Sequence, residues 1–175
     1  MKNVYYYARL LRGFYMALFV LAATLTSANA ESGVSVSNPE GQVIGVLVEP
    51  LRSNAKVAPT VMIRLHDGSV QATNASALTR NNQGYVLNHA ETPASETDAA
   101  KDAAFEVRSM TMAMIMQSHE DVKLLSQISD MTYSVNDNKL YLAGSLSSTR
   151  DLERLLNVTA DLCEFEIVPN IKIGA

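Results

Sequence analysis

The hydrophobic pattern changes its period once along the chain, and this change limits the possible folds more than any other feature. Over residues 33–89, apolar residues alternate with polar ones in short runs, as in half-buried β-strands. From residue 99 onward, apolar residues first recur at helical spacing and later alternate again. The stretch 90–98 combines a proline, three acidic residues and several hydroxyls, which is typical of a linker. We therefore expect two modules, 31–89 and 99–175, joined by a linker at 90–98.

The first module has the pattern of a small β-structure. Val61, Ile63 and Leu65 alternate with other residues up to Asp67-Gly68, and alternation resumes at Val70, so we expect a hairpin over 60–74. A second turn is expected at 81–84. Several short strands within so few residues favour a barrel-like module, because one short sheet would leave its edges unpaired.

The second module is expected to have the order α-β-β-α-β. A helix is predicted over 99–118, with Ser95 and Asp98 at capping-box spacing, and a second helix after Ser148 and Asp151. The strands between them place Leu140 and Leu142 on one face. The buried side of the first helix is predicted to hold Ala100, Ala103, Ala104, Val107, Met110, Met114 and Ile115.

The last strand of this module runs from Phe165 to Ile173, and Pro169 within it predicts a sheet edge or a bulge. Two amphipathic helices on one face of a three-stranded sheet would bury all these apolar stripes together. The fold class is therefore expected to be α+β.

Residues 1–30 have the three regions of a secretory signal peptide. Lys2, Arg9 and Arg12 form a basic leader, an uncharged apolar run covers 13–25, and 28–30 reads Ala-Asn-Ala, a cleavage pattern. An uncleaved anchor is the alternative, but the run is shorter than the roughly 20 apolar residues that span a bilayer. We expect cleavage after Ala30 and export to the periplasm.

Removal of the leader makes the chain more acidic. The full chain has 14 basic and 18 acidic residues; losing three basic residues leaves 11 basic residues and a net charge of about −7. Such a surface gains no counterion release from a phosphate backbone, so nucleic-acid binding is disfavoured. Peripheral membrane contact would need local basic or apolar patches.

Cys163 is the only cysteine, so no internal disulfide can form. A lone thiol of this kind is usually buried as a small hydrophobic side chain, and pairing with a partner is the alternative.

No arrangement typical of an active site is found. The three histidines, His66, His89 and His119, do not have metal-helix spacing, and no serine lies in a nucleophile-elbow motif. His66-Asp67 is explained by an Asp-Gly turn. We expect a non-enzymatic protein without a cofactor or catalytic residues.

The methionine-rich stretch 110–116 supports a sharper alternative. Met112, Met116 and His119 share one helical face, and thioethers with an imidazole suit copper, Cu(I) in particular. Packing of these methionines in the core or in a groove is the favoured explanation, because methionine fills gaps. A third possibility is that Met112 and Met116 form an exposed, adaptable apolar surface for a partner.

The second module resembles the BON-domain family. Residues 133–148 are similar to its strand, turn and glycine-containing strand leading into a hydroxyl-capped helix, and 161–173 are similar to its closing segment. Family members usually have a glycine before the last strand, where this chain has Cys163-Glu164, and the stretch 121–130 is longer than the usual connection. Gly144 is the clearest match, with an implied structural role.

The first module more faintly resembles the PRC-barrel family. The residues concerned are 41–46, 61–65, Asp67-Gly68, Ala77-Leu78 and 85–87. Together the two resemblances imply a binding module that contacts an envelope component, either a phospholipid surface or an assembly partner. Neither family has a common catalytic residue to carry over.

Overall fold

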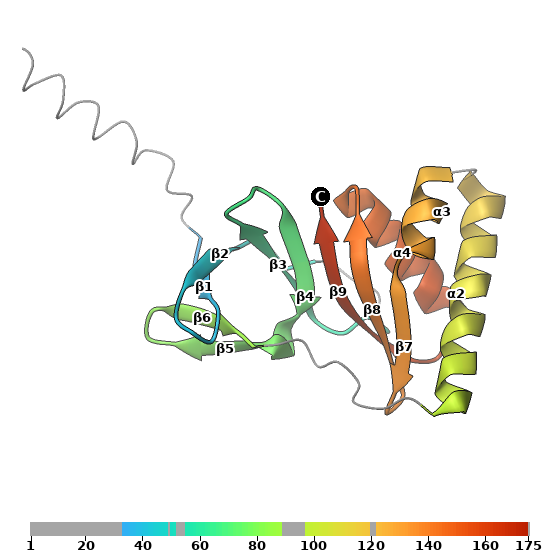
Figure 1. Ribbon diagram of the computed structural model, residues 1–175, viewed down its shortest axis with the longest axis horizontal. Coiled ribbons are helices and arrows are strands. Elements are labelled where there is room, and N and C mark those ends of the chain that lie inside the picture. Colours follow the sequence, from blue (N-terminus) through green and yellow to red (C-terminus); the bar gives the residue numbers. More distant parts are fainter. Residues whose placement is uncertain (1–32, 49, 52–54, 89–96, 120–121, 175) are drawn as a thin grey trace, which may run out of the picture. The chain divides into compact units, whose positions relative to one another are not determined.

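Nine strands form one sheet in the computed structural model, in the order β5-β6-β1-β2-β3-β4-β9-β8-β7 (Figure 1). The structure describes residues 33–48, 50–51, 55–88, 97–119 and 122–174; the side chains of residues 118 and 119 lie outside this description. The predicted signal peptide and most of the predicted linker therefore lie outside the described residues. The expected α+β class is confirmed.

The first six strands come from the predicted β-module, and short turns join several of them. Their bounds are β1 (Ser35–Ser37), β2 (Val43–Leu47), β3 (Thr60–Leu65), β4 (Val70–Asn74), β5 (Leu78–Asn81) and β6 (Gly84–Leu87), with the 3₁₀ turn η1 (Ala75–Ala77) before β5. The predicted hairpin is confirmed, because β3 and β4 pair antiparallel around Asp67-Gly68. The turn expected at 81–84 joins β5 to β6.

The pairing of β1–β6 does not form a closed barrel. Within the described residues, β5 pairs with β6 alone, and β4 pairs with β3 and β9. The strands of the first module therefore continue into the second module's sheet. Residues 34–175 form one compact unit.

The remaining elements are α2 (Asp98–His119), α3 (Val122–Ser129), β7 (Thr132–Asn136), β8 (Lys139–Leu146), α4 (Thr149–Leu162) and β9 (Glu166–Ile173). The β7–β8 connection is a tight turn in which Asp137 and Asn138 both have positive φ, 48° and 61°. The predicted N-cap of α4, Ser148, is confirmed, and Asp151 contacts it through its side chain. The Asp151 backbone N–H donates to Ser148 Oγ at 3.2 Å, and Ser148 Oγ donates to Asp151 Oδ2 at 2.7 Å. At α2, Thr97 Oγ1 accepts from the Ala100 N–H at 3.3 Å, and Ser95 lies outside the described residues.

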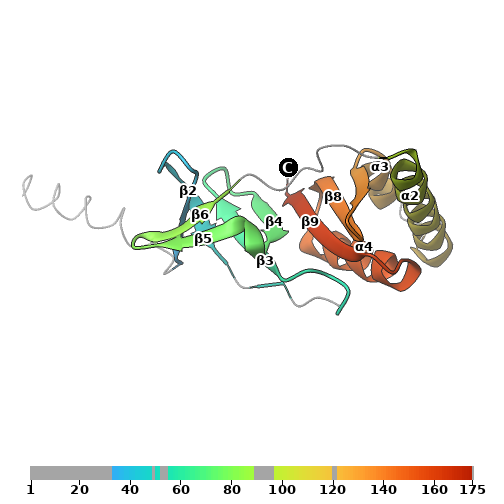
Figure 2. The same ribbon diagram turned by 90° about the horizontal axis from the view of Figure 1, so that it is seen from below.

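Three helices, and not the expected two, pack on one face of β7–β9 (Figures 1 and 2). The additional helix is α3, in a stretch that the sequence interpretation took for a connection. Leu124 and Ile128 lie one turn apart on α3 and are buried, so this short helix contributes to the core. The predicted orientation of β8 is confirmed, because Leu140 and Leu142 are both 0% exposed.

The buried face of α2 differs from the prediction at Met114 and Thr111, and Ala100, Ala103 and Met110 are only partly buried. Ala104, Val107 and Ile115 are buried as expected, and Thr111 is buried with them. Met114 is exposed, because Thr111 and Ile115 complete the inward face and turn residue 114 away from it. Thr111 Oγ1 lies 3.4 Å from Thr159 Oγ1 of α4, which gives both buried hydroxyls a partner.

β9 joins the two halves and is not an edge strand. It pairs antiparallel with β4, up to Thr73↔Asn170, and parallel with β8. Next to the end of the β4 pairing, Ile167 donates to Lys56 O at 2.8 Å and accepts from the Ala58 N–H at 2.9 Å. Backbone groups alternate in direction along a strand. The nitrogen of Pro169 therefore points to the gap between β4, which pairs with β9 from Asn170 onward, and the segment Lys56–Ala58, which bonds to Ile167. A proline is tolerated there because no ladder hydrogen bond is lost.

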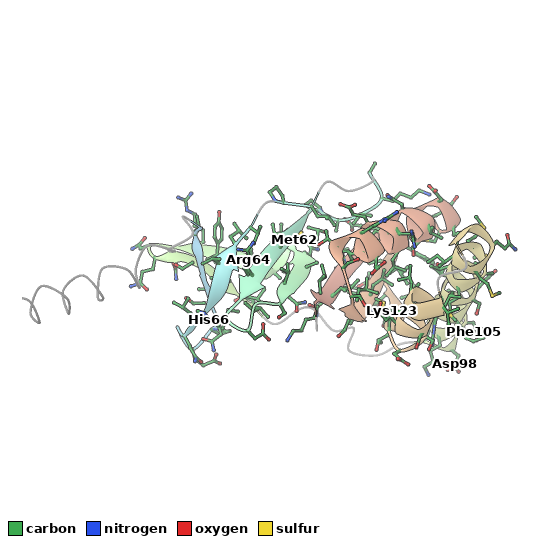
Figure 3. The ribbon with its side chains drawn as sticks, turned by 90° about the horizontal axis from the view of Figure 1, so that it is seen from above. Met62, Arg64, His66, Asp98, Phe105 and Lys123 are labelled. Carbon is green, nitrogen blue, oxygen red and sulfur yellow. The ribbon has the colours of Figure 1, made fainter. Side chains whose placement is uncertain are left out.

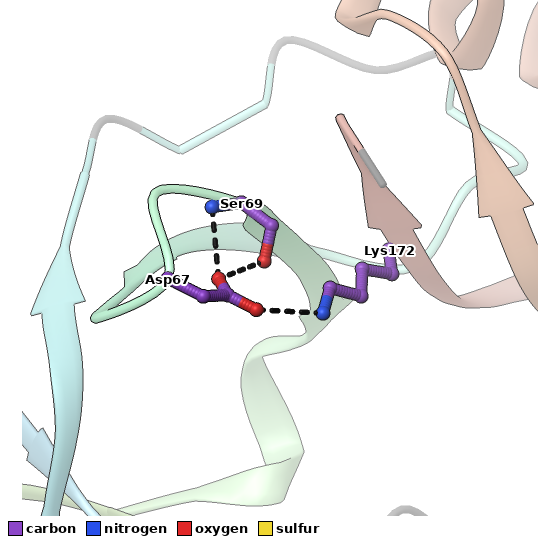
Figure 4. A network of polar contacts seen from close by, with 3 residues as sticks. All are labelled: Asp67, Ser69 and Lys172. Carbon is purple, nitrogen blue, oxygen red and sulfur yellow. Dashed lines mark hydrogen bonds and ion pairs between the residues drawn. The ribbon is translucent and has the colours of Figure 1, made fainter.

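Side chains add to this junction. Lys56 Nζ donates to Ala160 O at 3.0 Å and to Cys163 O at 2.9 Å, at the carbonyl end of α4. At the other end of β9, Lys172 Nζ donates to Asp67 Oδ2 at 2.8 Å, and Asp67 Oδ1 accepts from the Ser69 N–H and hydroxyl (Figure 4). These bonds lower the pKa of Asp67 far below its ordinary value, the ion pair with Lys172 first and the bonds from Ser69 next.

Candidate functional site

One face of α2 carries an exposed stripe of basic and apolar side chains. Lys101, Phe105, Arg108, Met112 and Met116 follow one another at intervals of three or four residues, so they lie along one side of the helix. We call these five residues the α2 stripe. Phe105 is 70% exposed and Met116 58%, whereas Met112 packs partly against the core. Figure 3 labels Phe105 near the start of α2.

The beginning of the stripe borders a pocket of about 330 Å³ between α2 and the start of β7. We call it the Tyr133 pocket. The helix presents its lining residues at successive turns, and Met131 to Tyr133 close the opposite wall. The lining residues are Lys101, Ala104, Phe105, Arg108, Met131, Thr132 and Tyr133.

Tyr133 supplies the most unusual group of this pocket. Its phenol oxygen is buried and has no hydrogen-bond partner, and it is the one such side-chain atom in the described part of the chain. Burial raises the pKa of Tyr133 well above its ordinary value of 10.0, and the nearby Arg108 only partly opposes this shift. The hydroxyl therefore stays protonated at neutral pH and can donate a hydrogen bond. A buried polar group without a partner is costly, so this hydroxyl would gain from an acceptor.

Two cationic side chains, Lys101 and Arg108, line the same pocket as Tyr133. Arg108 donates to the carbonyl of Ser129 at the end of α3, which fixes its guanidinium and leaves other N–H groups available. Lys101 Nζ lies 3.2 Å from Asp98 Oδ1, but both side chains are exposed, at 59% and 98%. Such a surface pair contributes little, so a ligand can compete with Asp98 for the ammonium group.

Met131 lines the pocket, and the absence of a side chain at Gly144 leaves space for it. Gly144 has φ of +153°, and a Cβ atom placed there would lie 2.7 Å from Met131 Cγ. The structural role expected for Gly144 therefore has a physical reason, which is close approach to Met131, the residue before the neighbouring strand β7. This contact holds the beginning of β7 in place below α2.

The chemistry of the pocket is that of anion binding. Its described lining offers two cationic side chains and the hydroxyl-bearing residues Thr132 and Tyr133, together with the apolar surfaces of Ala104, Phe105 and Met131. No carboxylate, histidine or cysteine is among these lining residues.

The methionines of the copper hypothesis both lie on the α2 stripe. Met116 is exposed and Met112 is partly buried, while the side chain of His119 lies outside the described residues. Across the described part of the chain, no cluster of three or more histidine, cysteine or acidic residues is placed to hold a metal ion. Copper binding by Met112, Met116 and His119 stays a prediction.

The other residues singled out in the sequence lie elsewhere. His66 lies at the end of β3, beyond Met62 and Arg64 (Figure 3), and its Nε2 is 2.9 Å from Val43 O. His89 lies outside the described residues. Cys163 is buried, as expected, and burial raises the pKa of its thiol. It therefore stays a neutral, weakly reactive group.

Comparison with known proteins finds no match among family models, curated proteins or solved structures. Among the described helices, none is long and apolar enough to cross a membrane.

Sequence reasoning did not find the Tyr133 pocket. Lys101 and Arg108 are seven residues apart in a helix that also contains acidic residues, so the pair gives no charge run. In the sequence, Tyr133 has the pattern of an ordinary core residue in an alternating strand. The usable signal was the spacing Lys101, Phe105, Arg108, which continues the Met112 and Met116 face toward the start of the helix.

Proposed function

We propose that this protein is an exported, non-enzymatic binding protein that contacts the anionic phospholipid surface of the cell envelope through the α2 stripe and the Tyr133 pocket. One lipid phosphate occupies the pocket, and the exposed apolar side chains of the stripe enter the interfacial layer. The observation that carries this proposal is the buried, unpartnered hydroxyl of Tyr133 in a residue that lines one pocket with Arg108 and Lys101.

The composition of the stripe favours a membrane over a free anion. A soluble phosphate would need only the cations and the hydroxyl, but Phe105 lines the same pocket and is 70% exposed. Of the six large hydrophobic side chains exposed among the described residues, Phe105 and Met116 lie on the α2 stripe. Exposed aromatic and aliphatic groups next to basic ones are typical of a surface that lies in the bilayer interface.

The acidic net charge is compatible with this contact because the acidic side chains of α2 lie mostly outside the α2 stripe. Asp102 and Glu106 follow Lys101 and Phe105 by one residue each, so they lie about 100° further round the helix. Only Asp98 lies along the stripe, and it is paired with Lys101. The contact is therefore local, and screening by salt will weaken its electrostatic part.

Vesicle flotation tests the proposal. The chain from residue 31 onward, which contains the whole compact unit, is mixed with vesicles of phosphatidylcholine, with or without phosphatidylglycerol. We expect flotation with the anionic vesicles. Arg108→Met should weaken it about fivefold, which corresponds to the roughly 1 kcal/mol contributed by one basic residue near an anionic surface. Phe105→Ser should weaken binding to both kinds of vesicle.

The matched controls remove the same kinds of side chain, one arginine and one apolar residue, at positions outside the α2 stripe. Arg150→Met removes an exposed arginine of α4, and Val43→Ser removes an exposed apolar side chain of β2. Both should float as the parent chain does. Equal loss for Arg150→Met and Arg108→Met, or no flotation of the parent chain, would refute the proposal.

Copper(I) binding through Met112, Met116 and His119 is the alternative function. It is favoured by the position of both methionines on one exposed stripe. Titration with Cu(I) against a competing chelator tests it, with Met112→Leu/Met116→Leu as the matched variant. One tight site that this variant loses would support the alternative, and absence of a tight site would exclude it.

A further inference from the structure

A second pocket lies on the other side of the sheet and is chemically different from the Tyr133 pocket. Its volume is about 490 Å³, within the range usual for small-ligand sites. Its walls come from the β1–β2 turn, four strands of the first half and β9. The lining residues are Asn38, Pro39, Glu40, Ile44, Leu65, Gln71, Thr73, Leu87, Asn88 and Asn170.

Pairing between β4 and β9 explains why this face is polar and open. Thr73 and Asn170 are direct cross-strand partners, and Gln71 lies two residues before Thr73, so all three side chains point to the same face. The neighbours Ala72 and Ile171 point to the opposite face, where they join the core below the helices. The polar side chains therefore lie on the helix-free face of the sheet.

Gln71 and Asn170 form a fixed amide pair. Gln71 Nε2 donates to Asn170 Oδ1 at 2.7 Å, which orients both amides. This bond leaves Asn170 Nδ2 as a donor and Gln71 Oε1 as an acceptor, and neither has a hydrogen bond to a residue that the structure describes. A donor and an acceptor side by side are the complement of a carboxamide group, which offers one C=O and one N–H.

The rest of the pocket selects against an anionic ligand. Leu65, Leu87 and Ile44 provide aliphatic surface, and Glu40 is the one charged residue among its described lining. An anion would find no cation here, in contrast to the Tyr133 pocket. The chemistry therefore suits an amide-bearing ligand that has small aliphatic side chains and no anionic group.

We infer that this amide pocket, between β4, β9 and the β1–β2 turn, binds a short extended peptide segment. The Gln71–Asn170 pair binds one main-chain amide of the peptide, and the aliphatic wall accepts an adjacent small side chain. The site is independent of the lipid contact on α2.

A titration by NMR tests this inference with the blocked dipeptide N-acetyl-alanyl-alanine amide as the probe. In the ¹⁵N-labelled chain from residue 31 onward, we expect saturable shifts of the Asn170 side-chain amide and of the backbone amides of Thr73 and Leu87. Resonances of Thr132 and Tyr133 at the other pocket should not move.

The decisive variant is Asn170→Asp. It keeps an oxygen to accept from Gln71 but replaces the free donor, so the affinity for the dipeptide should fall at least about tenfold. Asn157→Asp, at an exposed position on α4, adds the same charge elsewhere and should leave the affinity unchanged. The backbone spectrum of each variant reports whether the fold is retained.

Three outcomes would overturn the inference. The first is the absence of saturable shifts in the pocket. The second is a folded Asn170→Asp variant that binds the dipeptide as the parent chain does. The third is a pocket that responds to N-acetylglucosamine and not to the dipeptide, which would make it a sugar site.

Discussion

Replacing Tyr133 by phenylalanine removes one buried oxygen atom and leaves the ring that packs below α2. The hydroxyl has no hydrogen-bond partner in the described structure, and a buried polar group left in this state costs about 1–3 kcal/mol. Phenylalanine does not bear this cost. We therefore expect Tyr133→Phe to raise the free energy of unfolding by about 1–2 kcal/mol while it weakens binding to anionic vesicles.

Urea unfolding followed by far-ultraviolet circular dichroism measures the first effect, because the chain has no tryptophan. With a urea dependence of about 2 kcal/mol per M, the midpoint should rise by about 0.5–1 M. The assay belongs near pH 7, where Tyr133 is protonated in both the folded and the unfolded chain, because its pKa is 10.0 when exposed and is raised further by burial. Tyr141→Phe is the control: it removes a hydroxyl from the neighbouring strand β8 and should shift stability by less than about 0.5 kcal/mol.

The two readouts together separate a ligand-binding hydroxyl from a structural one. A structural hydroxyl would stabilise the fold, so its removal would lower the midpoint. A lower midpoint for Tyr133→Phe, or a higher midpoint with unchanged vesicle binding, would refute the reasoning that assigns this group to a ligand.

Three other perturbations test the packing that positions the pockets. Gly144→Ala should lower the free energy of unfolding by about 2–3 kcal/mol in urea, because residue 144 has a φ of +153° and the new Cβ would lie 2.7 Å from Met131 Cγ. Gly41→Ala is the control: its φ is +82°, but nothing lies within 4 Å of the new Cβ, so it should cost less. Equal losses for the two variants would contradict the steric argument. Lys56→Met should lower the free energy of unfolding by about 1 kcal/mol, because two carbonyls at the end of α4 lose a cationic donor at a partly exposed site. An unchanged urea midpoint would show that solvent replaces the lysine. Asp67 has a folded-state pKa below its unfolded value of 3.8, so its stabilising effect is complete above that value and is lost as the pH falls below it. Asp67→Asn should therefore reduce the difference in thermal midpoint between pH 6 and pH 3, and an unchanged difference would contradict the prediction.

Local features of the fold could be predicted from the sequence because short-range chemistry determines them. Asp67-Gly68 determines the β3–β4 hairpin, and the Ser148 hydroxyl starts α4. Alternation placed Leu140 and Leu142 in the core. Each of these depends on residues within a few positions of one another.

The parts that could not be predicted depend on contacts between distant segments. Pairing of β4 with β9 brings Gln71 beside Asn170, 99 residues further on, and no periodicity encodes that partnership. Helix α3 has two turns, too short for its Leu124 and Ile128 to establish a period. The exposure of Met114 follows from the packing of Thr111 against Thr159 on α4, which the pattern of α2 alone does not contain.

The Tyr133 pocket was missed for the same reason. It needs one face of α2, the end of α3 at Ser129 and the start of β7 together. Only the apolar part of the α2 stripe was visible in advance, as the face shared by Met112 and Met116.

The orientation of α2 on a membrane can be measured directly through the methionine methyl groups. With ¹³C-labelled methionine methyls and nanodiscs of phosphatidylglycerol and phosphatidylcholine that contain a spin-labelled lipid, we predict strong broadening of the Met116 signal. The signal of Met114, on another side of the helix, should broaden less, and that of Met62 on β3 should stay sharp. Broadening of Met62 equal to that of Met116, or none at either residue, would contradict a lipid contact through the α2 stripe.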